Sequence, residues 1–280
     1  MTPDLDSVTL AGGKLTADLA DAITTVTVDY GTDAVAQLVI GCIDSASALT
    51  GTPLLIPGRV LTWRGEPWET AGRTTTRGSD NTTVHEFTCR SQLARRLRRR
   101  YKASAEKKVS PSQWVTRRVA SAGGQVICQP SSKQSTIAQT SGRDRQSELD
   151  VIANLAGDLE WSWVEWGNRV IFGSRHWAWQ TGPTGRLWQV TWQSNPSTDA
   201  LSSEITADDD DTDNYVSGTL DLPYEYGSQL RPWDRIRMTG FGPTSDVLVD
   251  QVQITADGSS PVAVQFSQPR PPAKKSGSSS

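Results

Sequence analysis

The segment Glu148–Ser174, with the sequence ELDVIANLAGDLEWSWVEWGNRVIFGS, decides the fold class that we predict for this chain. Its first half repeats apolar residues every three or four positions, at Leu149, Ile152, Leu155 and Leu159. This spacing places them on one face of an amphipathic helix. Ser147 followed by Asp150 predicts a capping box at the start of the helix, because a side-chain oxygen there can accept from free backbone N–H groups.

The second half of the segment changes to a period of two residues. Trp161 and Trp163 alternate with smaller residues, and Gly167-Asn168 separates this run from the apolar run 169–172. Two alternating runs around a Gly/Asn pair predict a β-hairpin. A helix that leads directly into a Trp-rich hairpin is suited to docking, and nothing in it indicates catalytic chemistry.

The regions on both sides of this segment predict β-strands. Ile23–Tyr30 is β-branched and alternating, and the next three residues have turn composition. Turn signals recur about every 8–12 residues, as in a small antiparallel barrel or sandwich. Strand-like runs return from Trp177 onward, and the chain closes on a low-complexity segment rich in Pro, Lys and Ser.

We therefore predict an α+β fold, mostly β, in which two small antiparallel β-barrels flank a central α+β helix–hairpin unit. Within the central unit, Ser110-Pro111 predicts the start of another helix and Ser131–Arg145 predicts a loop. The predicted domains are a first barrel at 1–90, a central domain at 91–175, a second barrel at 176–268 and a disordered tail at 269–280.

Charge is strongly segregated along the chain, although the net charge is only −3. Residues 1–89 carry −6, residues 90–145 carry +12 and residues 146–280 carry −9. A basic middle between two acidic flanks indicates complementary surfaces, either within the molecule or between copies of it. The positive charge is concentrated on a short predicted helix after Ser91, where an apolar stripe alternates with arginines.

Two groups of residues are candidates for interfaces. The first is the arginine cluster, which we expect at a channel or an inter-subunit surface. The second is a set of tryptophans, which combine a large apolar body with an N–H donor; those of the hairpin are expected to pack against their own helix or a neighbouring copy. The candidate residues are Arg95, Arg96, Arg98, Arg99, Arg100, Trp161, Trp163, Trp166 and Trp233.

The sequence offers little for catalysis or for a cofactor. It contains no nucleophile elbow, phosphate loop or dinucleotide fingerprint, and its two histidines, His85 and His176, lie outside any metal-ligand spacing. The three widely spaced cysteines do not form a disulfide or zinc framework. We predict no enzymatic activity, no cofactor, no metal site and no catalytic residue. The acidic run Asp208–Asp213 lacks the ligand register of an EF-hand, and weak cation binding there stays an open question.

The sequence also bears on three further function classes. No apolar run approaches the roughly 20 residues that a membrane span needs. The arginine cluster could neutralise phosphates, but no base-reading motif accompanies it, so contact with DNA is expected only in transit. Eleven tryptophans also leave a carbohydrate-binding protein or glycosidase acting on host-wall polysaccharide as the alternative function.

The central region resembles the helix–hairpin of phage tail hub proteins. The similarity lies in Gln146–Ala156, Leu159–Trp163 and Asn168–Gly173, and it is supported by Cys89–Leu93 and Leu230–Ile236 in the flanks. That family includes late-control D proteins, contractile baseplate hubs and the upper part of type VI spike proteins. The order of the patterns over residues 8–270 is most similar to minor tail or hub proteins of long-tailed phages of actinobacteria.

The resemblance implies a structural virion protein. In such a family, three copies contribute two barrels each to a ring with six-fold-like symmetry, which joins the tail tube to the tail tip around a central channel. The implied partners are the other copies of a homotrimer, a distal tail protein, a tape-measure protein and tail-tip or spike proteins. The implied location is the tail tip of the virion, after synthesis and assembly in the host cytoplasm.

Overall fold

The computed structural model describes residues 8–10, 13–14, 17–44, 56–78, 82–101, 104–140, 145–192, 199–207, 214–241 and 246–271. The acidic run 208–213 and residues 272–280 of the predicted tail lie outside the described residues. In the described part, no helix has the length and apolar character needed to cross a membrane.

A 13-stranded sheet joins the N-terminal and C-terminal parts of the chain. The N-terminal part supplies β1 (Val8–Leu10), β2 (Gly13–Lys14), β3 (Ile23–Gly31), β4 (Gln37–Asp44), β5 (Val60–Trp63), β6 (Glu66–Arg77) and β7 (Thr83–Ser91), with helix α1 (Ala17–Ala22) before β3. The C-terminal part supplies β13 (Leu187–Thr191), β14 (Ser202–Ala207), β15 (Asn214–Leu222), β16 (Arg235–Thr239), β17 (Asp246–Thr255) and β18 (Val262–Pro269), with helix α6 (Tyr224–Gly227) after β15.

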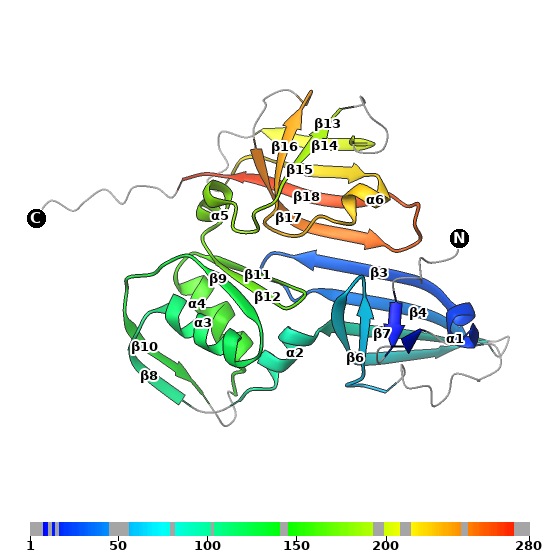
Figure 1. Cartoon of the computed structure of the whole chain (residues 1–280), viewed down its shortest axis with the longest axis horizontal. Coiled ribbons are helices and arrows are strands. Elements are labelled where there is room, and N and C mark those ends of the chain that lie inside the picture. The colour runs from blue at the N-terminus through cyan, green and yellow to red at the C-terminus, as the bar shows by residue number, and fades with distance from the viewer. Residues whose placement is uncertain are drawn as a thin grey trace, which may run out of the picture.

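Strands β3 and β17 form the seam between these two parts and lie side by side in Figure 1. They pair antiparallel, with Tyr30 opposite Val252. Among the described strands the main order is open, from β14 at one edge to β2 at the other. No closed barrel is therefore found there, and the prediction of two separate barrels is not confirmed. A pairing between residues more than 200 positions apart leaves no trace in local sequence patterns.

The central region forms a separate group of helices and short strands, drawn from teal to green in Figure 1. Its elements are α2 (Gln92–Arg98), β8 (Ser104–Val109), α3 (Pro111–Ser121), β9 (Gln125–Cys128), β10 (Ser135–Gln139), α4 (Glu148–Asp158), β11 (Ser162–Trp166), β12 (Arg169–Gly173) and α5 (Arg175–Thr181). Strands β11, β12 and β9 form one small sheet, and β8 pairs with β10 in another.

The predicted start signals of the central helices are confirmed. Ser110 caps α3 and Ser147 caps α4, each in a complete capping box. The β11–β12 hairpin is also confirmed, with Gly167 at its turn in the left-handed region at a φ of 62°. The loop prediction for Ser131–Arg145 is wrong in part, because residues 135–139 form β10 and pair with β8.

The expectation of strands from Trp177 onward is also corrected. Trp177 lies in α5, which Ser174 caps by accepting from the Trp177 backbone N–H. A serine cap and a left-handed Gly182 at the C-cap delimit this helix. Aromatic residues have an intrinsic preference for strands. In this segment the two helix caps and the packing of α5 against β17 and β18 outweigh that preference.

Hydrophobic side chains gather in three clusters. The first joins strands from both ends of the chain, and the second is built by the central helices. The β11–β12 hairpin stands between cores: Trp163 and Phe172 belong to the second cluster, while Val164 and Ile171 belong to a third that includes Trp233. Both faces of the hairpin are therefore covered, which explains why nearly every residue in it is buried.

Candidate interaction surface

Helix α2 carries the arginine cluster at the junction of the central region and the sheet. Ser91, the last residue of β7, accepts a hydrogen bond from the Ala94 backbone N–H and starts the helix without a connecting loop. Leu93 and Leu97 are buried in the second cluster. The other faces of the helix carry the arginines, and their position in its last turn is favoured by the helix dipole.

Arg95 of α2 and Arg99, the residue that follows the helix, bind the same buried carboxylate, that of Glu69. Arg95 Nε lies 3.3 Å from Glu69 Oε1, and Arg99 Nη1 lies 3.2 Å from Glu69 Oε2. Glu69 is 3% exposed, so the two guanidinium groups balance a charge that would be costly alone. These contacts tie α2 to β6 and serve the fold of this chain.

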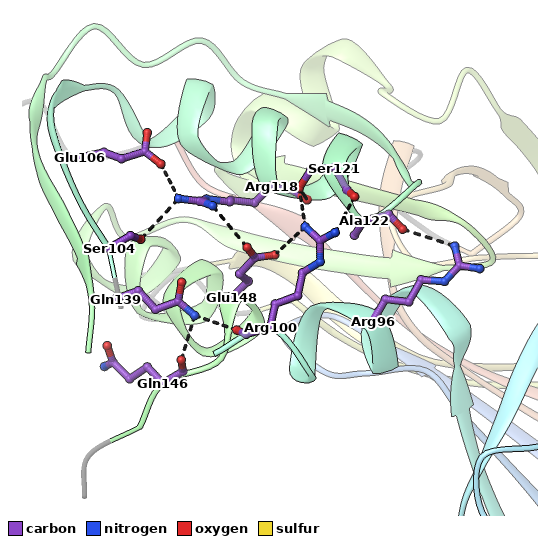
Figure 2. A network of polar contacts seen from close by, with 10 residues as sticks. All are labelled: Arg96, Arg100, Ser104, Glu106, Arg118, Ser121, Ala122, Gln139, Gln146 and Glu148. Atoms are coloured by element: carbon purple, nitrogen blue, oxygen red, sulfur yellow. Dashed lines mark hydrogen bonds and ion pairs between the residues drawn. The ribbon is translucent and has the colours of Figure 1, made fainter. Parts of the chain in front are cut away.

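Arg96 and Arg100 bind the C-terminal end of α3 through uncharged oxygen acceptors (Figure 2). Arg96 donates to the carbonyl of Ala122 at 3.3 Å. Arg100 donates to the hydroxyl and to the carbonyl of Ser121, at 2.6 Å each. The C-terminal ends of α2 and α3 are thereby held together, since both acceptors lie at the end of α3.

Glu148 is the centre of the network in Figure 2. Its two oxygens lie 3.6 Å from Arg100 Nη1 and 3.5 Å from Arg118 Nη1, and Arg118 also pairs with Glu106. Burial raises the pKa of Glu148, and the two guanidinium groups oppose that shift. Gln139 donates to the carbonyl of Arg100 at 2.7 Å and so adds β10 to the network.

Four of the five candidate arginines therefore have partners within the chain. The charge segregation left open complementary surfaces within the molecule, but it did not identify Glu69 or Glu148 as partners. Arg98 is exposed and makes no hydrogen bond or ion pair with the described residues. The expectation that the cluster faces a channel or another subunit stays a prediction, and Arg98 is the member that is free for it.

The candidate tryptophans lie mostly inside the fold. Trp163 and Trp233 are buried, so they present no surface to a partner in this conformation. Trp161 stacks edge-on against Phe172 at 5.4 Å, and the guanidinium of Arg169 lies 4.9 Å above the ring of Trp166. Five of the eleven tryptophans are buried and the other six are half-buried, so none is a fully exposed stacking platform for a sugar.

A polar junction with little solvent exposure connects the N-terminal and C-terminal parts of the chain. Tyr30 donates to Glu66 Oε2 at 2.6 Å, and Arg231 Nη2 donates to Glu66 Oε1 at 2.9 Å. The Arg231 guanidinium also lies 4.3 Å from the ring centre of Tyr30. Because these three residues come from distant parts of the sequence, no local pattern could have identified them.

Glu165 of β11 is the most perturbed acid at this junction. It is fully buried and accepts a hydrogen bond from the Ser91 hydroxyl. Burial, with a smaller contribution from the charge of Glu66, raises the pKa of Glu165 to about 8. The carboxyl is therefore mainly protonated at neutral pH. Because the protonated form is uncharged, it can be buried without a cationic partner.

Other reactive groups are placed as structural residues. Burial raises the pKa of the Cys42 and Cys89 thiols to about 12, which removes their nucleophilic thiolate form at neutral pH. His85 lies on β7 between Thr75 and Asp44, with Nδ1 3.1 Å from the threonine hydroxyl. Within the described ranges, no three His, Cys, Asp or Glu side chains form a group that could hold a metal ion.

Comparison with known proteins gives structural likeness without sequence matches. No family model matches this chain, and no curated protein matches its sequence. The Escherichia coli c3393 protein, a type VI secretion component described as similar to the T4 tail proteins gp27 and gp5, superposes with a TM-score of 0.63 at 11% identity. The match covers 95% of this chain and 77% of that protein.

Two phage-type tail proteins match over nearly their whole length. The 43 kDa tail protein of prophage MuSo2 from Shewanella oneidensis has a TM-score of 0.65 at 7% identity, covering 93% of this chain and 97% of that one. The tail protein of Neisseria meningitidis MC58 has a TM-score of 0.62 at 8% identity, covering 94% and 95%. The chain thus has the fold of phage-type tail proteins.

Proposed function

We propose that this protein is a structural component of a phage-type tail. The observation that carries the proposal is the shared fold, which extends over 93% of this chain and 97% of a prophage tail protein. A match across whole chains includes the central helices and hairpin together with the sheet, so it reflects the complete architecture and not one common motif. A fold alone does not define a function, and the site chemistry must agree with it.

The chemistry of the chain agrees with a structural role. Two buried acids with raised pKa values, Glu165 and Glu148, are engaged in contacts that hold α2, α3 and β11 together. Buried ion pairs and acids of this kind specify how elements dock. We accordingly propose that the protein is not an enzyme.

The finer assignment is a tail hub or minor tail protein. In this assignment, three copies of the protein form a ring around a channel, and the ring joins the tail tube to the tail tip. DNA contacts the ring only as it passes through the channel. The division into residues 1–90, 91–175 and 176–268 then describes two β-rich parts on either side of a connecting unit. Its neighbours would be a distal tail protein, a tape-measure protein and tail-tip or spike proteins of a long-tailed actinobacteriophage virion, assembled in the host cytoplasm.

Two measurements test this proposal. Native mass spectrometry of the full chain at high concentration, alone and with the proteins encoded beside it, is expected to show a trimer. Electron microscopy of tails that carry a tagged chain is expected to place the tag at the tip. A chain that stays monomeric with every neighbour and is absent from purified tails would refute the structural role. The carbohydrate alternative gains no support, because no tryptophan is fully exposed.

A further inference from the structure

A cavity of about 390 Å³ opens where the central region meets the large sheet. Arg90 at the end of β7 and Arg98 of α2 line one side of it. Asp29, Asp250 and Gln251 line the other side. The volume is within the range of about 300–1,000 Å³ that is typical of ligand pockets.

The two arginines have no anionic partner among the described residues. Arg90 is paired in the sheet with Glu69, but that carboxylate is bound by Arg95 and Arg99. Burial, together with the charges of Arg98 and Arg95, lowers the pKa of Arg90. Arg90 is half-buried and Arg98 is exposed; their like charges repel one another, and an anion placed between them would relieve that repulsion.

The acids of the opposite wall do not supply that anion. Asp29 accepts from Gln251 at 2.9 Å, and Asp250 pairs with Arg175. Strand β4 separates Asp29 from Arg90, because Gln37 lies opposite both of them. In the described part of the chain, neither aspartate forms an ion pair with Arg90, and their carboxylates contact Gln251 and Arg175.

We propose that this cavity receives a carboxylate side chain from a neighbouring protein chain. A guanidinium pair fits a planar carboxylate, with charge-assisted hydrogen bonds from each arginine. The acids on the far wall would repel a continuous polyanion such as DNA, whereas a single carboxylate next to amide or basic groups would suit both walls. The proposal does not depend on the tail function, since it concerns the chemistry of the partner and not its identity.

The test is binding of a fluorescently labelled peptide that carries a single glutamate between glutamines to the full chain, followed by anisotropy at low and physiological salt. Arg98→Gln is expected to weaken binding about tenfold or more, and Arg90→Gln by a similar factor, since each removes a charge-assisted hydrogen bond. Arg98 is exposed, so its substitution leaves folding intact. The matched control is Arg73→Gln on β6, an exposed arginine with the same loss of charge, which is expected to change the affinity less than about twofold.

Three outcomes would overturn the proposal. The first is an absence of saturable peptide binding to the unsubstituted chain. The second is an equal loss of affinity in the Arg73→Gln control, which would show general attraction to positive charge. The third is binding of a single-stranded oligonucleotide that depends on Arg98 while peptide binding does not, which would assign the arginines to nucleic acid.

Discussion

Replacement of Glu165 by Gln should stabilise this protein at alkaline pH and leave it nearly unchanged at acidic pH. Glu165 is fully buried at the junction of β11, β7 and β6, near Glu66 and Tyr30. Its folded-state pKa is about 8, against an ordinary value of 4.5. Gln keeps the shape and can still accept the Ser91 hydrogen bond, but it carries no proton to lose.

The sign follows from proton binding in the two states. Between pH 4.5 and 8 the folded protein holds a proton on Glu165 that the unfolded chain has released. Unfolding therefore becomes more favourable as the pH rises through this window. At about 1.4 kcal/mol per pKa unit, the free energy of unfolding falls by about 5 kcal/mol by pH 8 and by about 3 kcal/mol by pH 7. Glu165→Gln removes this loss.

Urea unfolding monitored by tryptophan fluorescence measures the effect. The difference in free energy of unfolding between Glu165→Gln and the unsubstituted protein should grow by about 1.4 kcal/mol per pH unit from about pH 5 to 8. Glu86→Gln, at an exposed position on β7, is the matched control and should show no such slope. A flat difference, or one that shrinks with pH, would falsify the account of Glu165 as a neutral buried acid.

Three further outcomes are expected. Glu148→Ala should lower the free energy of unfolding by about 2 kcal/mol in urea titrations, because it leaves Arg100 and Arg118 without their shared, buried partner. Gly218→Ala should speed hydrogen exchange in β14, because the new Cβ would lie 2.1 Å from the Glu204 carbonyl oxygen, whereas Gly72→Ala meets no atom within 4 Å and is the control. Wall glycans should leave the tryptophan fluorescence of this protein unchanged. Saturable quenching by any of them would support the alternative function of carbohydrate binding.

Local structure in the central region could be predicted because its signals are local. The capping boxes at Ser110 and Ser147 each lie within four residues, and the Gly167-Asn168 turn acts on its immediate neighbours. The arginine cluster was identified as a unit, but its partners were not. Glu69 and Glu148 are ordinary acids in the sequence, and only the docking of α2 between β6 and α4 brings them within reach.

The sequence by itself determined the mostly β fold class, the helix–hairpin and the separation of a basic middle from acidic flanks, since each depends on residue type and on spacing within a few positions. The tertiary structure decided which surfaces exist. It joined β3 to β17 in one sheet, covered both faces of the hairpin, and assembled Tyr30, Glu66 and Arg231 from distant segments. Such contacts depend on the closure of long loops, and no local pattern records which loops close.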